Sequence, residues 1–276
     1  MTAPIAQPSA QGLSPVLLLH GLTGAPAELQ TVTRHLRRNG YAVETPMLRG
    51  HGVDEATLLK TGWRDWLAGA EEELFRLTAD GQKAIVGGLS MGAILALALA
   101  ERHPDRVKGV LSLAATFRYD GWVVPPGVWM MPLLRPVPFI NRWRFKERPP
   151  YGIKDERLRA VVEEMMFSGS IKDAGLPYMP GISLVENLAL VKWVERDLAK
   201  VKAPVLICHA VEDDITRLSN AERMAARVSG PVRKLYLKDS YHLVTVDRER
   251  AKVAQACLEF CNDLCSDKAM ALQTAA

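Results

Sequence analysis

The residue best placed to do chemistry in this sequence is a serine in the run Gly88-Leu89-Ser90-Met91-Gly92. An apolar, strand-like run precedes it at 83–87, and an Ala/Leu-rich, helix-like run follows at 93–100. A strand that turns sharply into a helix leaves no room for side chains beside the turning residue, so glycines fit there. The turn strains the serine backbone and lifts its hydroxyl clear of the sheet. The pentapeptide alone arises by chance in roughly one chain in ten, so the flanking runs carry the signal.

Attack by the Ser90 hydroxyl requires a base that removes its proton, and histidine is the usual base. Six histidines are candidates: His20, His35, His51, His103, His209 and His242. Only His242 lies in a loop, 238–243, between the last expected strand and the last expected helix. From there a side chain can reach back across the carboxyl edge of a sheet. We therefore predict that His242 is the base.

A carboxylate must orient that base and stabilise its charged form. The acidic run Glu212-Asp213-Asp214 directly follows the strand that ends at His209, so it opens at a strand carboxyl end. Asp213 is the first choice and Asp214 the second. Asp120, which follows the strand at 107–113, is the third.

Acyl transfer also needs N–H donors for the oxyanion that develops on the substrate. Met91 follows the serine at the start of a helix, where the backbone N–H groups and the dipole favour negative charge. The second donor is expected from the loop His20-Gly21-Leu22-Thr23-Gly24 after the first strand, with Leu22 as the donor. The glycines of this loop also permit a tight turn, and the two roles are compatible.

The elements that must position these residues alternate along the chain. Strand-like apolar runs occur at 15–20, 41–45, 83–87, 107–113, 203–209 and 232–237. Helix-like runs occur at 27–38, 63–78, 93–100, 219–228 and 248–263. This alternation predicts an α/β fold with a mostly parallel sheet covered by helices on both faces.

The region 117–200 breaks the alternation and predicts a mainly helical insertion over the carboxyl ends of the strands, where ligands of open α/β sheets bind. It contains Trp122, Trp129, Trp143 and Trp193 and many methionines, which suit the adaptable apolar wall of a lid. An ordinary packed subdomain with no part in binding is the alternative. The apolar run 128–134 is the first candidate for an acyl pocket. The expected division is a mobile tail at 1–14, a core at 15–116 and 201–266, a lid at 117–200 and a second tail at 267–276.

Bulk properties narrow the class of protein. The 276 residues, with 48% hydrophobic and 24% charged residues, suit one large soluble domain. A net charge of +4 and a densest basic run at 34–38 argue against nucleic-acid binding. No stretch is apolar enough to span a bilayer, and residues 1–11 lack the features of a secretory signal. Cys257, Cys261 and Cys265 recur along one helix face and fit buried reduced thiols, so we expect a cytoplasmic protein. The sequence does not indicate the oligomeric state.

Taken together, these features resemble the α/β-hydrolase superfamily. The resemblance rests on the serine motif at 88–92, the chain order Ser90, Asp213, His242 and the loop at 20–24. The runs at 20–24, Gly50-His51-Gly52 and 240–245 are similar to those of small bacterial carboxylesterases and monoacylglycerol lipases. Tyr241 departs from the glycine that relatives often carry, which leaves the local pocket shape open.

The resemblance implies hydrolysis of carboxylic esters, either short or medium acyl esters or monoacylglycerols, without a metal or organic cofactor. It assigns Ser90 as nucleophile, His242 as base, Asp213 as acid, and the Leu22 and Met91 amides as oxyanion donors.

Other activities stay open because fold and triad do not fix the bond that is cleaved. An amidase, aminopeptidase, lactonase or carbon–carbon hydrolase could use the same residues. An aminopeptidase must bind a substrate ammonium, for which Glu163, Glu164 and Glu186 are the candidates. A non-catalytic receptor on a hydrolase scaffold is less favoured, because a receptor needs no complete triad.

Overall fold

The computed structural model describes residues 12–134, 140–168 and 175–266. The strands are β1 Val16–Leu19, β2 Val43–Glu44, β3 Ala84–Leu89, β4 Val107–Leu113, β5 Arg144–Lys146, β6 Tyr178–Pro180, β7 Val205–Ala210 and β8 Val232–Leu237. The α-helices are α1 Gln30–Arg38, α2 Glu55–Leu58, α3 Trp63–Leu77, α4 Met91–Arg102, α5 Glu156–Ser168, α7 Gly181–Asp197, α8 Leu218–Ala225 and α9 Arg250–Cys265. Short 3₁₀ helices are η1 Pro26–Leu29, η2 Val128–Leu134, η3 Ile140–Arg142 and η4 Leu198–Lys200.

The central sheet has six parallel strands in the order β2-β1-β3-β4-β7-β8. All four residues of β1 and all six of β3 are buried, as expected for strands covered on both faces. Since all six strands run the same way, their carboxyl ends share one edge, where the loops after β1, β3, β4, β7 and β8 meet. The expected α/β fold is therefore confirmed.

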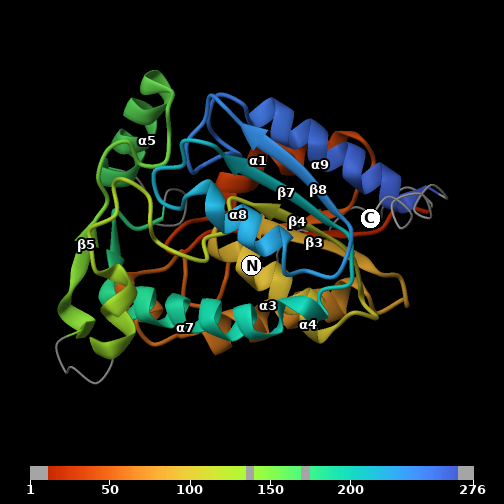
Figure 1. Cartoon of the computed structure of the whole chain (residues 1–276), viewed down its shortest axis with the longest axis horizontal. Coiled ribbons are helices and arrows are strands. Elements are labelled where there is room, and N and C mark those ends of the chain that lie inside the picture. Colours follow the sequence, from red (N-terminus) through yellow and green to blue (C-terminus); the bar gives the residue numbers. More distant parts are fainter. Residues whose placement is uncertain (1–11, 135–139, 169–174, 267–276) are drawn as a thin grey trace.

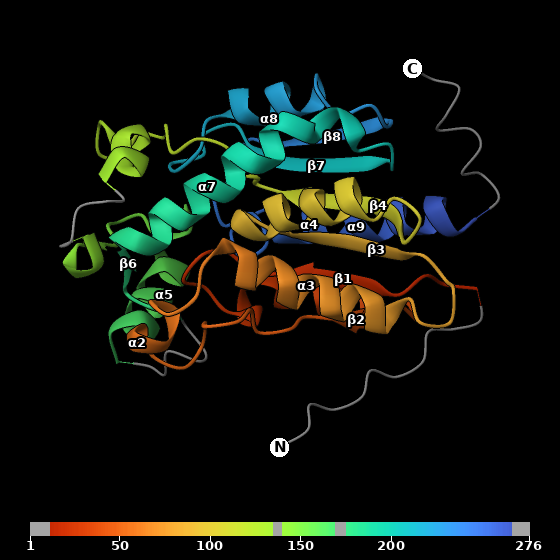
Figure 2. The same ribbon diagram turned by 90° about the horizontal axis from the view of Figure 1, so that it is seen from below.

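Helices cover both faces of this sheet (Figure 1). Figure 2 shows α3, α4, α7 and α8 in front of the sheet, with α9 behind it. The front layer is built on α4, in which every residue from Met91 to Glu101 is buried. The rear layer packs α1 against α9, and Cys257 and Cys261 of α9 are buried there as free thiols.

The insertion after β4 forms a cap at one end of the molecule, on the left of Figures 1 and 2. It contains η2, η3 and α5, in line with the helical content expected there, but also the antiparallel pair β5–β6, which was not predicted. Three-residue strands are too short to show an alternating pattern. A small apolar cluster around Val128, Met131 and Ile140 packs the cap against the first half of α7.

The second half of α7 does not belong to the cap. Its Leu190, Val191 and Val194 lie in the same apolar cluster as the side chains of α3 and α4. A helix of 17 residues is about 25 Å long, enough to run from the cap across the sheet. The region 117–200 therefore shares its last helix with the core.

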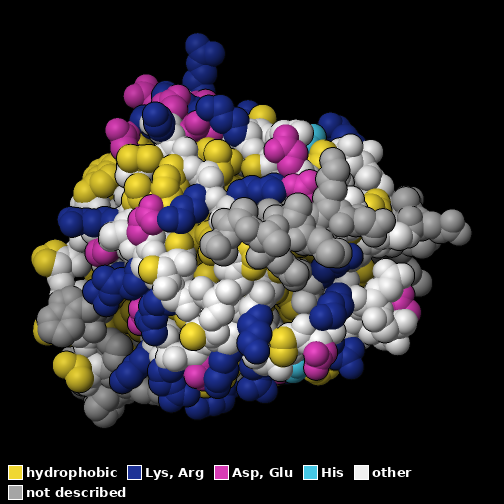
Figure 3. Space-filling model, turned by 45° about the vertical axis from the view of Figure 1, so that its right-hand side comes forward, with side chains coloured by type: hydrophobic (Ala, Val, Ile, Leu, Met, Phe, Trp, Pro, Cys, Tyr) yellow, Lys and Arg dark blue, Asp and Glu magenta, His cyan; other side chains and the backbone are white. Residues whose placement is uncertain are grey.

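The predicted tails lie almost wholly outside the described residues, at 1–11 and 267–276. Within 12–134, 140–168 and 175–266, no helix combines the length and apolarity needed to cross a membrane. Lys and Arg side chains are scattered among hydrophobic and acidic ones over the face shown in Figure 3.

Candidate active site

The turn from β3 to α4 has the strained geometry that the glycine pattern predicted. Ser90 has φ 55° and ψ −113°, in the left-handed half of φ space that non-glycine residues rarely occupy. A Cβ added to Gly88 would lie 2.4 Å from the Leu19 carbonyl oxygen, and one added to Gly92 would lie 1.9 Å from the same atom. The elbow therefore packs backbone against backbone on β1, and only glycine fits on either side of Ser90.

The structure brings His242 and Asp213 together. The imidazole Nδ1 lies 2.9 Å from Asp213 Oδ2 and 3.1 Å from Oδ1, and both side chains are buried. Asp213 is held by the backbone N–H groups of Ile215 and Thr216, which donate to its Oδ1 at 2.9 and 2.8 Å. A buried carboxylate with these donors fixes the orientation of the ring.

Burial and charge oppose each other in this pair. Burial alone would lower the pKa of His242, but the charge of Asp213 and the hydrogen bond to it raise that pKa above its ordinary value. Burial alone would raise the pKa of Asp213, but the charge of His242 and its hydrogen bond lower it. The pair therefore favours an ionised Asp213 beside a ring that readily accepts a proton.

The second and third acid candidates lie elsewhere. Asp214 accepts the backbone N–H of His242 at 3.2 Å and that of Gly152, in the cap, at 3.1 Å. Burial and the neighbouring charge of Asp213 raise its pKa. Asp120 accepts the backbone N–H of Arg217 at 2.8 Å, beside α8. In this geometry Asp213 alone of the three carboxylates contacts the imidazole.

The loop that carries Leu22 is fixed by hydrogen bonds on the preceding residue. The Leu22 N–H shares a planar peptide with the Gly21 carbonyl, so the two point in opposite directions. That carbonyl lies 2.8 Å from His20 Nδ1 and accepts the Gly24 N–H at 3.2 Å. Because His20 Nε2 accepts the Leu48 N–H at 3.1 Å, Nδ1 carries the proton and donates. Burial, together with the charge of neighbouring His51, lowers the pKa of His20 to about 3, so the ring stays neutral.

The other predicted donor, Met91, is the first residue of α4. The first N–H groups of a helix have no partner within it, so the Met91 N–H is free to face a ligand beside Ser90. Leu22 and Ser90 both line the cavity described next. The two expected donors therefore come from the loop after β1 and from the first residue of α4.

A cavity of about 820 Å³ lies between the sheet edge and the cap. Its core side includes Leu22, Ser90 and His242. Its cap side is mainly apolar, with Val124, Val128, Phe145, Val162, Met165, Leu176, Met179 and Leu184. Val128, Met165 and Met179 of the insertion thus line the cavity.

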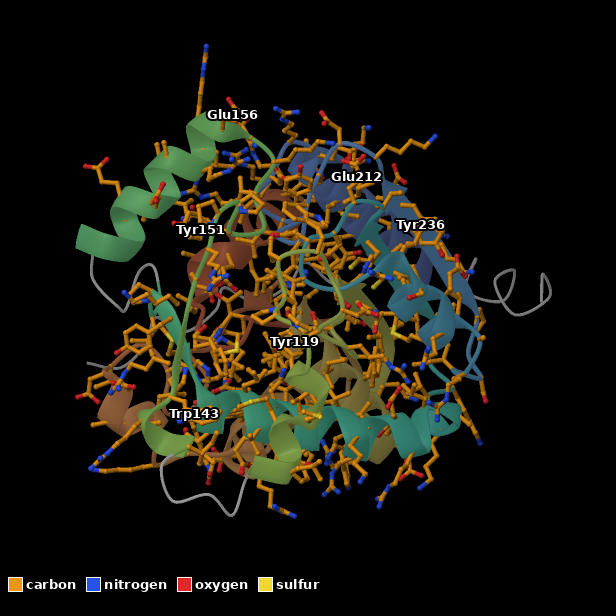
Figure 4. The ribbon with its side chains drawn as sticks, turned by 60° about the vertical axis from the view of Figure 1, so that its left-hand side comes forward. Tyr119, Trp143, Tyr151, Glu156, Glu212 and Tyr236 are labelled. Carbon is orange, nitrogen blue, oxygen red and sulfur yellow. The ribbon has the colours of Figure 1, made fainter. Side chains whose placement is uncertain are left out.

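The tryptophans do not contribute to that wall as expected. Trp122 is 60% exposed and its ring meets Tyr241, while Trp143 is 43% exposed at the outer end of the cap (Figure 4). Trp193 packs against Trp63 at a ring distance of 5.4 Å, on the α3 side of the core. The side chain of Trp129 lies outside the described residues. An aromatic-rich composition was thus a poor guide to the cavity lining.

The structure adds three residues that the sequence analysis missed. Ser90 Oγ lies 2.9 Å from the hydroxyl of Thr116, a buried residue three positions after β4. Thr116 follows the carboxyl end of β4, which pairs with β3, and this position in the sequence could have indicated that it lies near Ser90. Glu28 and Glu147 are the two carboxylates that line the cavity among the described residues. Nothing in their spacing pointed there.

The carboxylates proposed for binding a substrate ammonium have other neighbours. Glu163, in α5, accepts a hydrogen bond from the hydroxyl of Tyr151, which is labelled in Figure 4, at 2.9 Å. Glu186 lies near the start of α3 and accepts the Trp63 N–H at 3.4 Å. Glu163, Glu164 and Glu186 are not among the described residues that line the cavity.

Comparison with known proteins shows that this chain is similar to a protein family, to characterised hydrolases and to solved structures. A family model described as serine aminopeptidase, S33 matches residues 13–249. A thermostable monoacylglycerol lipase from Bacillus sp. (strain H-257) is 28% identical over 246 residues, which is 89% of each chain. A carboxylesterase from Bacillus subtilis (strain 168) is 26% identical over 252 residues, covering 90% of this chain and 92% of the relative. A solved structure of a metagenome-derived lipolytic enzyme, from work on LipS and LipT, superposes with a TM-score of 0.76 at 24% identity, covering 93% of this chain and all of that one. The resemblance to carboxylesterases and monoacylglycerol lipases is confirmed.

Proposed function

The chain belongs to the serine aminopeptidase S33 family of α/β-hydrolases, and we propose that it is a serine esterase acting through an acyl-enzyme. Ser90 is the nucleophile, His242 the base and Asp213 the acid of its triad, with the Leu22 and Met91 N–H groups as oxyanion donors. The observation that carries the proposal is the 2.9 Å contact from Asp213 to His242, whose ring lines the same cavity as the strained Ser90.

In the proposed reaction, His242 Nε2 takes the Ser90 proton while Oγ bonds to the ester carbonyl carbon. The carbonyl oxygen becomes an oxyanion held by the Leu22 and Met91 N–H groups. Collapse breaks the carbon–oxygen bond to the alcohol, which leaves with the proton from His242. Water then attacks the acyl-enzyme by the same route and releases the carboxylic acid and free Ser90.

The resting serine hydroxyl lies against Thr116, so the first event is a rotation of Ser90 toward the imidazole. The imidazole must be neutral to accept the proton. Because Asp213 raises the pKa of His242, the rate should fall as the pH drops through a value above about 6.5, and level off at higher pH.

The cavity supports esters of short or medium acyl chains, or monoacylglycerols, as substrates. Its volume of about 820 Å³ and mainly apolar cap wall suit an acyl chain rather than a charged group. The relatives named monoacylglycerol lipase and carboxylesterase support the same class.

An aminopeptidase is the second candidate. The family description names that activity, and Glu28 and Glu147 face the cavity, where a carboxylate could pair with a substrate ammonium. The triad would cleave an amide by the same steps, with the amine as the leaving group.

The test is labelling with a fluorophosphonate probe, followed by a panel of p-nitrophenyl esters, monoacylglycerols and aminoacyl amides. We expect the wild-type protein to be labelled and to hydrolyse esters. Ser90→Ala should lose labelling and lower kcat by about 10⁴–10⁶ with the fold intact by circular dichroism. More than a tenth of the wild-type activity in Ser90→Ala would refute the nucleophile, and amide cleavage exceeding ester cleavage would favour the aminopeptidase.

A further inference from the structure

Glu28 is a carboxylate on the rim of the proposed active site that the mechanism above does not use. It lies in η1, half-buried, and lines the cavity together with Ser90 and His242. Its Oε2 accepts the Gly21 N–H at 3.1 Å. A Cβ added to Gly24 would lie 2.0 Å from its Oε1, so the carboxylate also fills the space above that glycine.

We propose that Glu28 is a positioning residue, which fixes the peptides that aim the Leu22 oxyanion donor and whose charge acts on the His242 imidazole. The inference rests on the proposed function, because it assigns a role relative to that triad and oxyanion site.

The positioning role follows from the hydrogen bonds around Gly21. His20 and Gly24 hold the carbonyl of the peptide that carries the Leu22 N–H. Glu28 holds the N–H of the peptide before it, so both polar groups of Gly21 are bound. A glycine has the widest choice of backbone conformations of any residue, so fixing both of its peptides restricts the donor to one direction. Removing the Glu28 side chain removes the hydrogen bond that Gly21 makes to a residue outside the loop at 20–24.

The charge role follows from where the carboxylate sits. A Cβ added to Gly21 would lie 3.4 Å from Glu28 Oε2 and 3.8 Å from Ser90 Cβ, so the carboxylate and the serine flank the same backbone atom. An anion on this rim favours the imidazolium form of His242, and the Glu28 charge contributes to raising the pKa of that ring. Burial raises the pKa of Glu28 itself to about 7.

Other charged or titratable groups surround these two. Arg144 is paired with Glu55 at 2.7 Å, away from the triad. The remaining groups that line the cavity or act on His242 are Lys146, Glu147, Arg148, Tyr119, Tyr151, His209, Asp213 and Asp214. A substitution of Glu28 alone changes none of these residues, so it tests the charge of Glu28 separately from theirs.

The experiment compares kcat and KM of three variants with those of the wild type, using p-nitrophenyl acetate from pH 5 to 9. Glu28→Gln keeps an oxygen that can accept the Gly21 N–H but removes the charge. We expect its kcat plateau within about threefold of wild type and its acid limb displaced to lower pH by about half a unit, because the imidazolium loses an anionic neighbour. Glu28→Ala removes the acceptor as well. Its kcat should fall about tenfold with little change in KM, a fraction of the loss that follows removal of a whole oxyanion donor.

Glu259→Gln is the matched control, because it removes the same kind of charge from an exposed carboxylate of α9 that does not line the cavity. It should leave both kcat and the acid limb unchanged. An acid limb of Glu28→Gln that superimposes on the wild type overturns the charge role, and a wild-type kcat in Glu28→Ala overturns the positioning role. If Glu28→Ala does not fold, the Glu28→Gln profile still decides the charge role. Failure of the wild type to react with fluorophosphonate would instead refute the proposed function, so the two failures are distinguishable.

Discussion

The elbow around Ser90 and the cap wall opposite it are built in contrasting ways. At the elbow the closest contacts join backbone to backbone, and the positions of Gly88 and Gly92 have no room for a single carbon. The cap wall consists of side chains, and some of them, such as Met165 at 43% exposed, are only partly covered. Main-chain geometry fixes the position of the nucleophile, whereas the wall that meets the substrate can be altered residue by residue. Substitutions should therefore act on catalysis at one side and on selectivity at the other.

After replacement of the nucleophile, the largest effect is expected at the carboxylates on the core side. Asp213→Asn should lower kcat by about 10⁴, because the amide orients the imidazole in the wrong tautomer and cannot stabilise its charge. Asp214→Asn is the matched control, since it changes an adjacent buried carboxylate that bonds only backbone N–H groups. It should cost far less. Steady-state kinetics on one ester give the comparison.

A more severe loss in Asp214→Asn than in Asp213→Asn would exchange the two roles. Equal, small losses would mean that neither carboxylate is the acid, and Asp120 would become the candidate despite its place beside α8.

The elbow itself can be broken without touching a polar group. Gly92→Ala would place a carbon 1.9 Å from the Leu19 carbonyl oxygen, and backbone cannot move aside as a side chain can. We expect a loss of about 3 kcal/mol in the free energy of unfolding, at the upper end for overpacked sites, and a parallel loss of activity. Urea denaturation measures the first and ester hydrolysis the second.

Gly69→Ala in α3 is the control for this substitution, because its Cβ would meet only the flexible side chain of Arg49 at 3.2 Å. It should be neutral or gain up to about 1 kcal/mol in helix stability. A Gly92→Ala variant as stable as Gly69→Ala would show that the elbow is less constrained than its contacts indicate.

The smallest effect is expected at the cap. Val128→Ala removes part of the apolar wall and so enlarges the cavity. It should shift the preferred acyl length toward longer esters, while acetate hydrolysis stays within about threefold of wild type. Apolar contacts distinguish substrates by only about 1–3 kcal/mol per methylene. Leu133→Ala, in the same 3₁₀ helix but 72% exposed, is the control and should leave the profile unchanged. Identical chain-length profiles for the two variants would mean that Val128 does not line the acyl pocket.

The sequence predicted most of the core because its signals are local. The strands β4 and β8 were predicted with the bounds that the structure gives them, since each is a short run of strand length that contains valine and leucine. The elbow was predictable because a sharp turn demands glycine at fixed spacing. The pairing of Asp213 with His242 could be inferred because parallel strands bring their following loops to one edge.

The cap and the cavity lining were less accessible, for a physical reason. Glu28 reads as an ordinary exposed helix residue, and only the packing of the loop at 20–24 against η1 brings it to the cavity. The shared helix α7 shows no break between its cap half and its core half, since both halves carry apolar residues that become buried. The tryptophans suggested an apolar wall by composition alone, but composition does not show which way a side chain points.

The two carboxylate oxygens of Asp214 link the cap to the loop that carries His242. One binds the backbone of His242 and the other the backbone of Gly152 in the cap, while the Gly152 carbonyl accepts the Leu243 N–H at 2.8 Å. A few residues further on, the Lys154 and Asp155 N–H groups are both anchored to Asp247. Residues 152–155 of the cap are therefore held by hydrogen bonds to the loop that carries His242 and to Asp214. A cap motion that admits substrate must keep these hydrogen bonds, because breaking them would displace the His242 imidazole relative to Ser90.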